Sequence, residues 1–218
     1  MKKEYSIYAK LYDPILYFAI KSIRKAVMHE LSEFKDMAII DICCGTGNQL
    51  KLLSKNGFKN LHCLDISESM LDVAQQGDHP IKFYAEDATK MSFENEMFDV
   101  AILSFAIHEK DRKTQENLMC EAYRILKNKG IMLVVDYVSD SETAYPGKTA
   151  IRLIEWIAGG EHYKNFKNYI ENDGLRGLIN TEKFKRLSSG RKLFNAIILS
   201  IYQKAADDSD GSMPTRQA

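Results

Sequence analysis

The 218-residue sequence predicts an α/β domain built on a mostly parallel sheet. Three observations predict this fold class. An apolar run at residues 38–42 leads into a glycine-containing turn, and a helical pattern follows at once. Strand-like runs recur at 61–65, 81–85, 100–104 and 131–135, and the fourth of the five is continuously apolar, as in a sheet covered on both faces. Helical patterns lie between several of these runs, which favours parallel strands joined by crossover helices.

Composition indicates one globular domain, which we assign to residues 1–204. Hydrophobic residues make up 45% of the chain and charged residues 28%. The 30 basic and 30 acidic residues cancel and show no basic stripe, which argues against nucleic acid as a partner. No apolar run is long enough to span a bilayer and no targeting segment is evident, so we expect a cytoplasmic protein without an integral membrane span. The oligomeric state is not indicated.

The cysteines show neither the paired spacing nor the histidine spacing of a metal site. We interpret them as small buried hydrophobic residues in a reducing cytosol, and we expect no bound metal. They are Cys43, Cys44, Cys63 and Cys120.

The remaining elements follow in chain order. Asp13-Pro14 opens the first helix, with Asp as its N-cap and Pro at its first position. An amphipathic helix is predicted from Thr114 to Lys127, with Gly130 as its stop. Residues 140–181 form a helical insertion between the fifth and sixth strands. Strands at 184–187 and 193–202, joined by a Ser-Ser-Gly-Arg turn, form a terminal antiparallel hairpin, and residues 205–218 form a polar tail that we expect to be disordered.

The turn after the first strand is the predicted ligand site. Glycines let the backbone approach a ligand closely because they have no Cβ. A dinucleotide turn requires a third small residue, but Leu50 follows Gly45 and Gly47. Asp41, at the end of the strand, suits an ammonium group and repels a pyrophosphate. The pattern therefore favours S-adenosylmethionine (SAM) over NAD.

The string Asp-Ile-Cys-Cys-Gly-Thr-Gly at residues 41–47 resembles motif I of the class I SAM-dependent methyltransferases, usually written D/E-x-G-x-G-x-G. Cys43 takes the place of the first glycine, and this form is similar to that of the ubiquinone/menaquinone biosynthesis C-methyltransferases. Later segments, including Glu-Asp-Ala at 86–88, resemble the same family. The resemblance implies a Rossmann-like, seven-stranded sheet, a helical flap at residues 1–36, and a substrate cover at 140–181.

The resemblance also implies SAM as the cofactor, S-adenosylhomocysteine as the product, and a small-molecule methyl acceptor attacked in line with the sulfonium methyl. Asp65, 18 residues beyond Gly47, has the spacing of an acid that binds a ribose. Asp87 would accept from the adenine amino group, although an exposed acidic turn is the competing interpretation. The predicted cofactor-binding residues are Tyr8, Tyr12, Asp41, Cys43, Gly45, Gly47, Asp65, Ile66, Met70, Asp87, Ala88 and Ser104.

His108 follows the fourth strand at the same sheet edge and is the candidate general base, since its ordinary pKa lies near neutrality. A capping or surface histidine is the competing interpretation. The candidate acceptor-pocket residues are Phe105, Trp156, His162 and Tyr163, although aromatic residues on helices often belong to a core.

The sequence leaves the acceptor open. A quinol C-methyltransferase and an N-, S- or O-methyltransferase acting on another small metabolite both fit the motifs. The glycine turn is also compatible with a non-catalytic SAM-binding regulatory module and, less well because of Leu50, with an NAD-dependent dehydrogenase.

Overall fold

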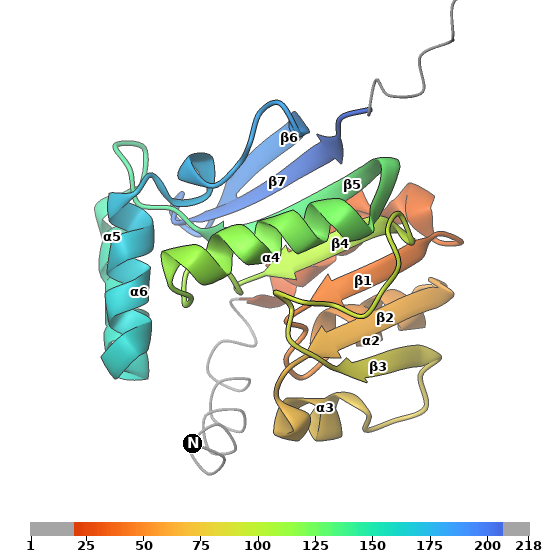
Figure 1. Ribbon diagram of the computed structural model, residues 1–218. Helices are drawn as coiled ribbons and strands as arrows, with labels where there is room; N and C mark the ends of the chain where they lie inside the picture. The colour runs from red at the N-terminus through yellow and green to blue at the C-terminus, as the bar shows by residue number, and fades with distance from the viewer. Residues whose placement is uncertain (1–19, 207–218) are drawn as a thin grey trace, which may run out of the picture.

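One mixed sheet of seven strands organises the part of the chain that the computed structural model describes, residues 20–206 (Figure 1). Its order is β3-β2-β1-β4-β5-β7-β6. The first five strands along the chain are mutually parallel, and β7 pairs antiparallel with both β5 and β6. The predicted α/β fold with a terminal antiparallel hairpin is therefore confirmed. The strands are β1 (Ala38–Ile42), β2 (Asn60–Asp65), β3 (Ile81–Ala85), β4 (Phe98–Ser104), β5 (Leu126–Tyr137), β6 (Phe184–Lys192) and β7 (Ile197–Lys204).

Helices cover both faces of the sheet. A helix over residues 20–30 precedes the short 3₁₀ turn η1, and a second 3₁₀ turn, η2, follows the last helix. No helix in this range combines the length and apolar character needed to cross a membrane. The bounds are η1 (Ser32–Phe34), α2 (Asn48–Lys55), α3 (Glu68–Ala74), α4 (Arg112–Ile125), α5 (Tyr145–Ala158), α6 (Gly160–Glu171) and η2 (Gly174–Gly177).

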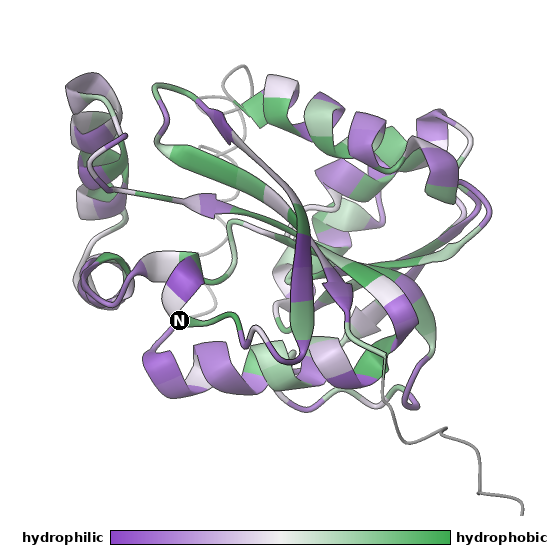
Figure 2. Cartoon of the chain, turned by 90° about the horizontal axis from the view of Figure 1, so that it is seen from above, coloured by the Kyte–Doolittle hydropathy of each residue, from purple (hydrophilic) through white to green (hydrophobic). Residues whose placement is uncertain are grey.

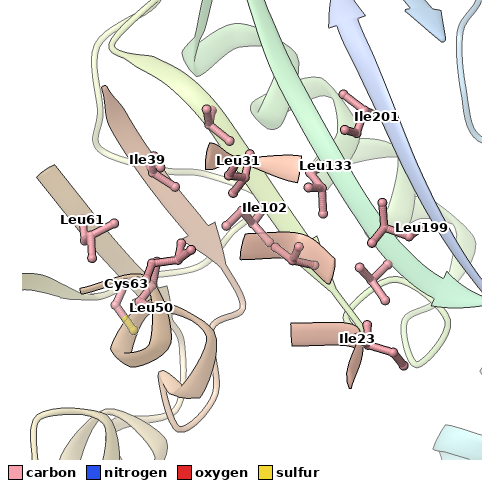
Figure 3. Close-up of a cluster of buried hydrophobic side chains, with 14 of the residues drawn as sticks. Ile23, Leu31, Ile39, Leu50, Leu61, Cys63, Ile102, Leu133, Leu199 and Ile201 are labelled. Carbon is pink, nitrogen blue, oxygen red and sulfur yellow. The ribbon is translucent and has the colours of Figure 1, made fainter. Parts of the chain in front are cut away.

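The central strands are apolar on both sides because successive side chains point to opposite faces. Ile39 packs in one core with the helix over residues 20–30, α2 and α3, whereas its neighbour Ile40 packs in a second core with α4. Figure 3 shows part of the first core, including Ile23, Leu50 and Ile102. Figure 2 shows hydrophobic stretches on strands of the sheet and bands of both hydrophilic and hydrophobic residues along the helices.

Helices α5 and α6 lie side by side at the end of the molecule towards which the parallel strands point (Figure 1). They fall within residues 140–181, the predicted insertion between the fifth and sixth strands, here β5 and β6. The Asn165 side chain on α6 donates to the backbone oxygen of Glu109, 2.9 Å away, which ties this helix to the loop after β4. The division of the chain into flap, sheet domain and cover stays a prediction.

The predicted end of α4 was wrong. The helix stops at Ile125, and Gly130 lies inside β5 instead of capping the helix. Lys127 forms an ion pair with Asp99 of β4 at 2.9 Å, which holds this segment against the sheet. A Cβ on Gly130 would lie 2.9 Å from the backbone oxygen of Lys127, so the glycine permits a close backbone approach.

The predicted hairpin turn was also wrong. β6 continues through the Ser-Ser-Gly-Arg segment, with Gly190 paired to Leu199, and the turn lies at residues 193–196. Leu193, Phe194 and Asn195 take positive φ values of 46°, 57° and 60° there. The turn contains neither a glycine nor a proline that would indicate it in the sequence. Its position follows from the pairing of β6 with β7.

Candidate cofactor and active site

The sheet reverses its order between β1 and β4, and this is where an open α/β sheet forms its ligand crevice. Two non-glycine residues with positive φ flank this point: Cys43 after β1, at 59°, and Phe105 after β4, at 55°. Such conformations are disfavoured for residues with a Cβ and concentrate at functional sites. Cys43 thus adopts the backbone conformation of the glycine that it replaces in the motif.

The glycines of the turn have different roles. Gly45 has φ 53°, and a Cβ placed on it would find no atom within 4 Å, so its backbone faces open space. Gly47 has φ 68° and is the N-cap of α2; a Cβ there would lie 3.0 Å from the Cβ of Ala74. Gly45 therefore leaves room for a ligand, whereas Gly47 lets the turn pack against α3.

Two predicted acids lie at neighbouring strand ends. Asp41 is 2% exposed; burial and the charge of Asp65, partly offset by Arg24, raise its pKa to about 7. The Asp65 carboxylate accepts from the backbone N–H of Gly45 at 2.8 Å and of Ser67 at 2.9 Å. Burial nevertheless raises the pKa of Asp65, against the effect of these bonds. Little positive charge lies near these two buried carboxylates to balance them. The pair therefore suits a ligand that carries a positive charge and hydroxyl groups.

A disulfide joins Cys44 in the turn to Cys63 in β2. The expectation of four reduced cysteines is therefore corrected; Cys43 and Cys120 are free, and Cys120 is exposed. Adjacent strands bring the pair together, because β1 and β2 are parallel neighbours with Asp41 opposite Cys63. A separation of 19 residues in the sequence does not reveal this contact.

The other predicted cofactor residues lie around the same edge. Ile66 is 71% exposed directly after Asp65, which leaves an apolar surface available to a ligand. Ala88 is buried and Met70 is half-buried. Asp87 is exposed and accepts from the backbone and hydroxyl of Thr89, both at 2.8 Å.

Ser104 ends β4, and Tyr8 and Tyr12 lie outside the described residues, as does the predicted helix start at Asp13-Pro14. Within residues 20–206 no group of three or more His, Cys, Asp or Glu side chains is placed to hold a metal ion.

His108 lies in a buried cluster of charges. Its Nδ1 is 2.6 Å from Asp136, and its Nε2 is 3.4 Å from Glu155 of α5. Burial alone would lower the pKa of His108, but the two carboxylates outweigh it and raise the pKa to about 10. The ring is therefore a cation near neutral pH, with both nitrogens occupied. In this arrangement it holds α5 against the ends of β4 and β5.

The predicted acceptor-pocket residues separate into two groups. Phe105 and Tyr163 are half-buried and pack against the first core, as part of an aromatic cluster with Tyr137 and Phe166. His162 faces Glu109 at 3.6 Å. Trp156 is 66% exposed on the outer side of α5, so the structure does not bring it to the site.

Three site residues escaped the sequence reasoning: Asp136, Tyr137 and Glu155. Asp136 ends an apolar strand as Asp41 and Asp65 do, so the same signal was available for it. No signal marks Glu155, because its position in a helix gives no hint that it contacts His108.

Fold and site together define a class, an α/β protein whose crevice suits a cationic ligand with hydroxyl groups. Residues 39–130 match the profile of a family described as a methyltransferase domain. A demethylmenaquinone methyltransferase from Leptospira interrogans is 25% identical over 199 residues, covering 78% of this chain and 76% of the relative. One from Staphylococcus aureus is 29% identical over 136 residues, covering 59% and 55%.

Solved structures share the fold. A SAM-dependent methyltransferase from Methanosarcina mazei has a TM-score of 0.60 at 19% identity, covering 79% of this chain and 94% of its own. Magnesium protoporphyrin IX methyltransferase from Synechocystis, crystallised with bound SAH, has a TM-score of 0.63 at 16% identity, covering 84% and 83%.

The chain therefore carries a methyltransferase domain and is a SAM-dependent methyltransferase by class, with SAM as its cofactor. Within this class it is similar to the demethylmenaquinone and ubiquinone/menaquinone biosynthesis C-methyltransferases. The predicted family, enzyme class and cofactor are confirmed.

Proposed function

We propose that this chain methylates a ring carbon of a small hydroquinone of the demethylmenaquinol type. The observation that carries the proposal is the similarity to demethylmenaquinone methyltransferases, which extends over 78% of the chain. The aromatic cluster beside the crevice supports it, since Phe105 and Tyr137 have ring centroids 5.5 Å apart and a flat acceptor ring stacks well on such groups.

SAM, when bound, supplies a methyl group on a positively charged sulfur that needs no further activation. The protein residues bind SAM and orient it towards the acceptor. We assign the methionine ammonium to Asp41 and the ribose hydroxyls to Asp65, whose carboxylate the Gly45 and Ser67 N–H groups already orient. Holding both reactants aligned and excluding water supplies much of the acceleration in such reactions.

His108 as general base stays a prediction. It requires the ring to release a proton that Asp136 and Glu155 both stabilise. The geometry supports a positioning role for His108 instead, through its contact with the cover helix α5. Cytoplasmic location stays a prediction as well.

The test is methyl transfer from labelled SAM to a short-chain demethylmenaquinol, with the product identified by mass spectrometry. We expect a C-methylated quinol, and we expect Asp65→Asn to abolish transfer by weakening SAM binding. A label found on an oxygen, nitrogen or sulfur of another metabolite in a cell extract would assign a different acceptor. SAM binding with no transfer to any extract component would indicate a non-catalytic SAM-binding module.

A further inference from the structure

Helix α5 has an unusually apolar exposed side for a surface helix. Its buried side carries Gly147, Ile151 and Glu155, whereas its exposed side carries most of its large apolar residues. Tyr145 is 82% exposed, Trp156 66% and Ile157 62%. Leu153 lies on the same side at 53%. A helix whose exposed side is apolar normally contacts another protein surface or a membrane on that side.

The two basic residues of α5 are Lys148, which is half-buried, and Arg152, which is exposed. Lys148, Arg152 and Trp156 follow one another at intervals of four and so form one row along the helix. Neither Lys148 nor Arg152 forms an ion pair with another described residue within 4 Å. The one acid of α5, Glu155, is directed inward to His108 at 3.4 Å.

The turn between β6 and β7 lies beside the start of α5, where Phe194 is next to Gly147. The backbone N–H of Ala144 donates to the backbone oxygen of Phe194, 3.0 Å away, so the two segments touch. Phe194 is 64% exposed and Leu193 is 40% exposed, and Lys192 precedes them. We call the combined surface the α5 face; it consists of Tyr145, Lys148, Arg152, Leu153, Trp156, Ile157, Lys192, Leu193 and Phe194.

We propose that the α5 face docks on an anionic lipid bilayer surface. Exposed Trp and Tyr side chains favour the interfacial region of a bilayer, and adjacent Lys and Arg side chains are attracted to anionic headgroups. A second copy of the chain fits less well. Packing two α5 faces together would bring their basic residues close to each other, with no acid on this side of the helix to neutralise them.

Leu153 and Ile157 lie on the side of the helix away from Glu155, the residue that contacts His108. Docking would therefore place α5 between the lipid and the carboxyl ends of β4 and β5. A lipid-soluble acceptor would then have a short route to the crevice, which deepens the proposed function. The docking itself rests on α5 and its neighbouring turn, and it holds whether or not the acceptor is a quinol.

Trp156 is the one tryptophan of the chain, and it is exposed on this surface near the C-terminal end of α5. Its fluorescence therefore reports docking without any label. We expect a blue shift and co-sedimentation with vesicles of equal parts phosphatidylglycerol and phosphatidylcholine, weakened by salt, and much weaker binding to phosphatidylcholine alone.

Two variants separate the apolar and the charge contributions. The double variant Leu153→Ser, Ile157→Ser keeps Trp156 and should weaken vesicle binding at least about tenfold. The pair Lys148→Glu, Arg152→Glu should abolish the preference for anionic vesicles. The pair Lys55→Glu, Lys113→Glu changes the net charge equally on α2 and α4 and should bind like the wild type.

SAM affinity measured on each variant shows that the fold is intact. An unshifted Trp156 spectrum with both kinds of vesicle overturns the proposal. So does a blue shift that grows with protein concentration in the absence of lipid and coincides with a dimer in light scattering, because this indicates a second copy. None of these readouts uses methyl transfer, so a failed activity assay leaves the docking result interpretable.

Discussion

The substitution Asp136→Asn tests the buried charge cluster most directly. The Asp136 side chain is fully buried and accepts from four N–H groups, the shortest being His108 Nδ1 at 2.6 Å and the Tyr137 backbone at 2.7 Å. An amide at this position removes the negative charge and leaves the His108 cation paired with Glu155 alone. Breaking a buried pair in this way costs about 3–5 kcal/mol.

For a chain of this size such a loss lowers the melting temperature by about 6–20 °C. The assay is chemical and thermal denaturation at neutral pH. Asp36→Asn is the matched control, since Asp36 and Lys59 also lie 2.6 Å apart but both side chains are 75% exposed. Water and salt screen that pair, so we expect little change.

The pH dependence of the free energy of unfolding provides a second test of the same charge cluster. The folded-state pKa of His108, about 10, lies above its ordinary value of 6.5. The stabilisation from this raised pKa is fully present below about pH 6.5 and is lost as the pH rises through about 10. The gap in stability between wild type and Asp136→Asn should therefore narrow over this range. Equal effects of Asp136→Asn and Asp36→Asn, or a gap that widens with pH, would refute the reasoning.

Three further predictions concern the cofactor loop. Because the pKa of Asp41 is about 7 without ligand, a bound ammonium must displace its proton at lower pH, and calorimetry should show SAM affinity falling roughly tenfold per pH unit below about pH 7. The Asp41→Asn variant should bind SAM weakly, with an affinity that does not change with pH. A wild-type SAM affinity that does not change with pH would remove Asp41 from the ammonium site. Because Cys43 has positive φ, Cys43→Gly should change the free energy of unfolding by less than about 1 kcal/mol, whereas Cys43→Val should destabilise by at least about 1–2 kcal/mol. Similar denaturation midpoints for these two variants would contradict the strained conformation. Reduction of the disulfide between Cys44 and Cys63 should lower the free energy of unfolding by about 3 kcal/mol, as should Cys63→Ala, and denaturation with and without a thiol measures it. No response to the thiol in the wild type would mean that the bond does not constrain the loop.

Much of the fold was predictable because buried parallel strands leave a strong pattern. Ile39 and Ile40 are both apolar because the sheet is covered on both faces, and the glycines after β1 mark the turn. Element ends were less predictable. Gly130 resembles a helix stop, but its pairing within β5 depends on β4, which is distant in the sequence.

The candidate site divides in the same way. Asp41, Asp65 and His108 end or follow strands and were found by that position. Glu155 was missed, because only folding brings it to His108. The exposed position of Trp156 was equally hidden, since a tryptophan on a helix is more often buried.

The bond between Cys44 and Cys63 has a practical consequence at the bench. It connects the cofactor loop covalently to the strand that ends in Asp65, so the thiol content of a purification buffer alters the binding element itself. Preparations made with and without dithiothreitol are then chemically different enzymes. Their SAM affinities should be compared only after free thiols have been counted.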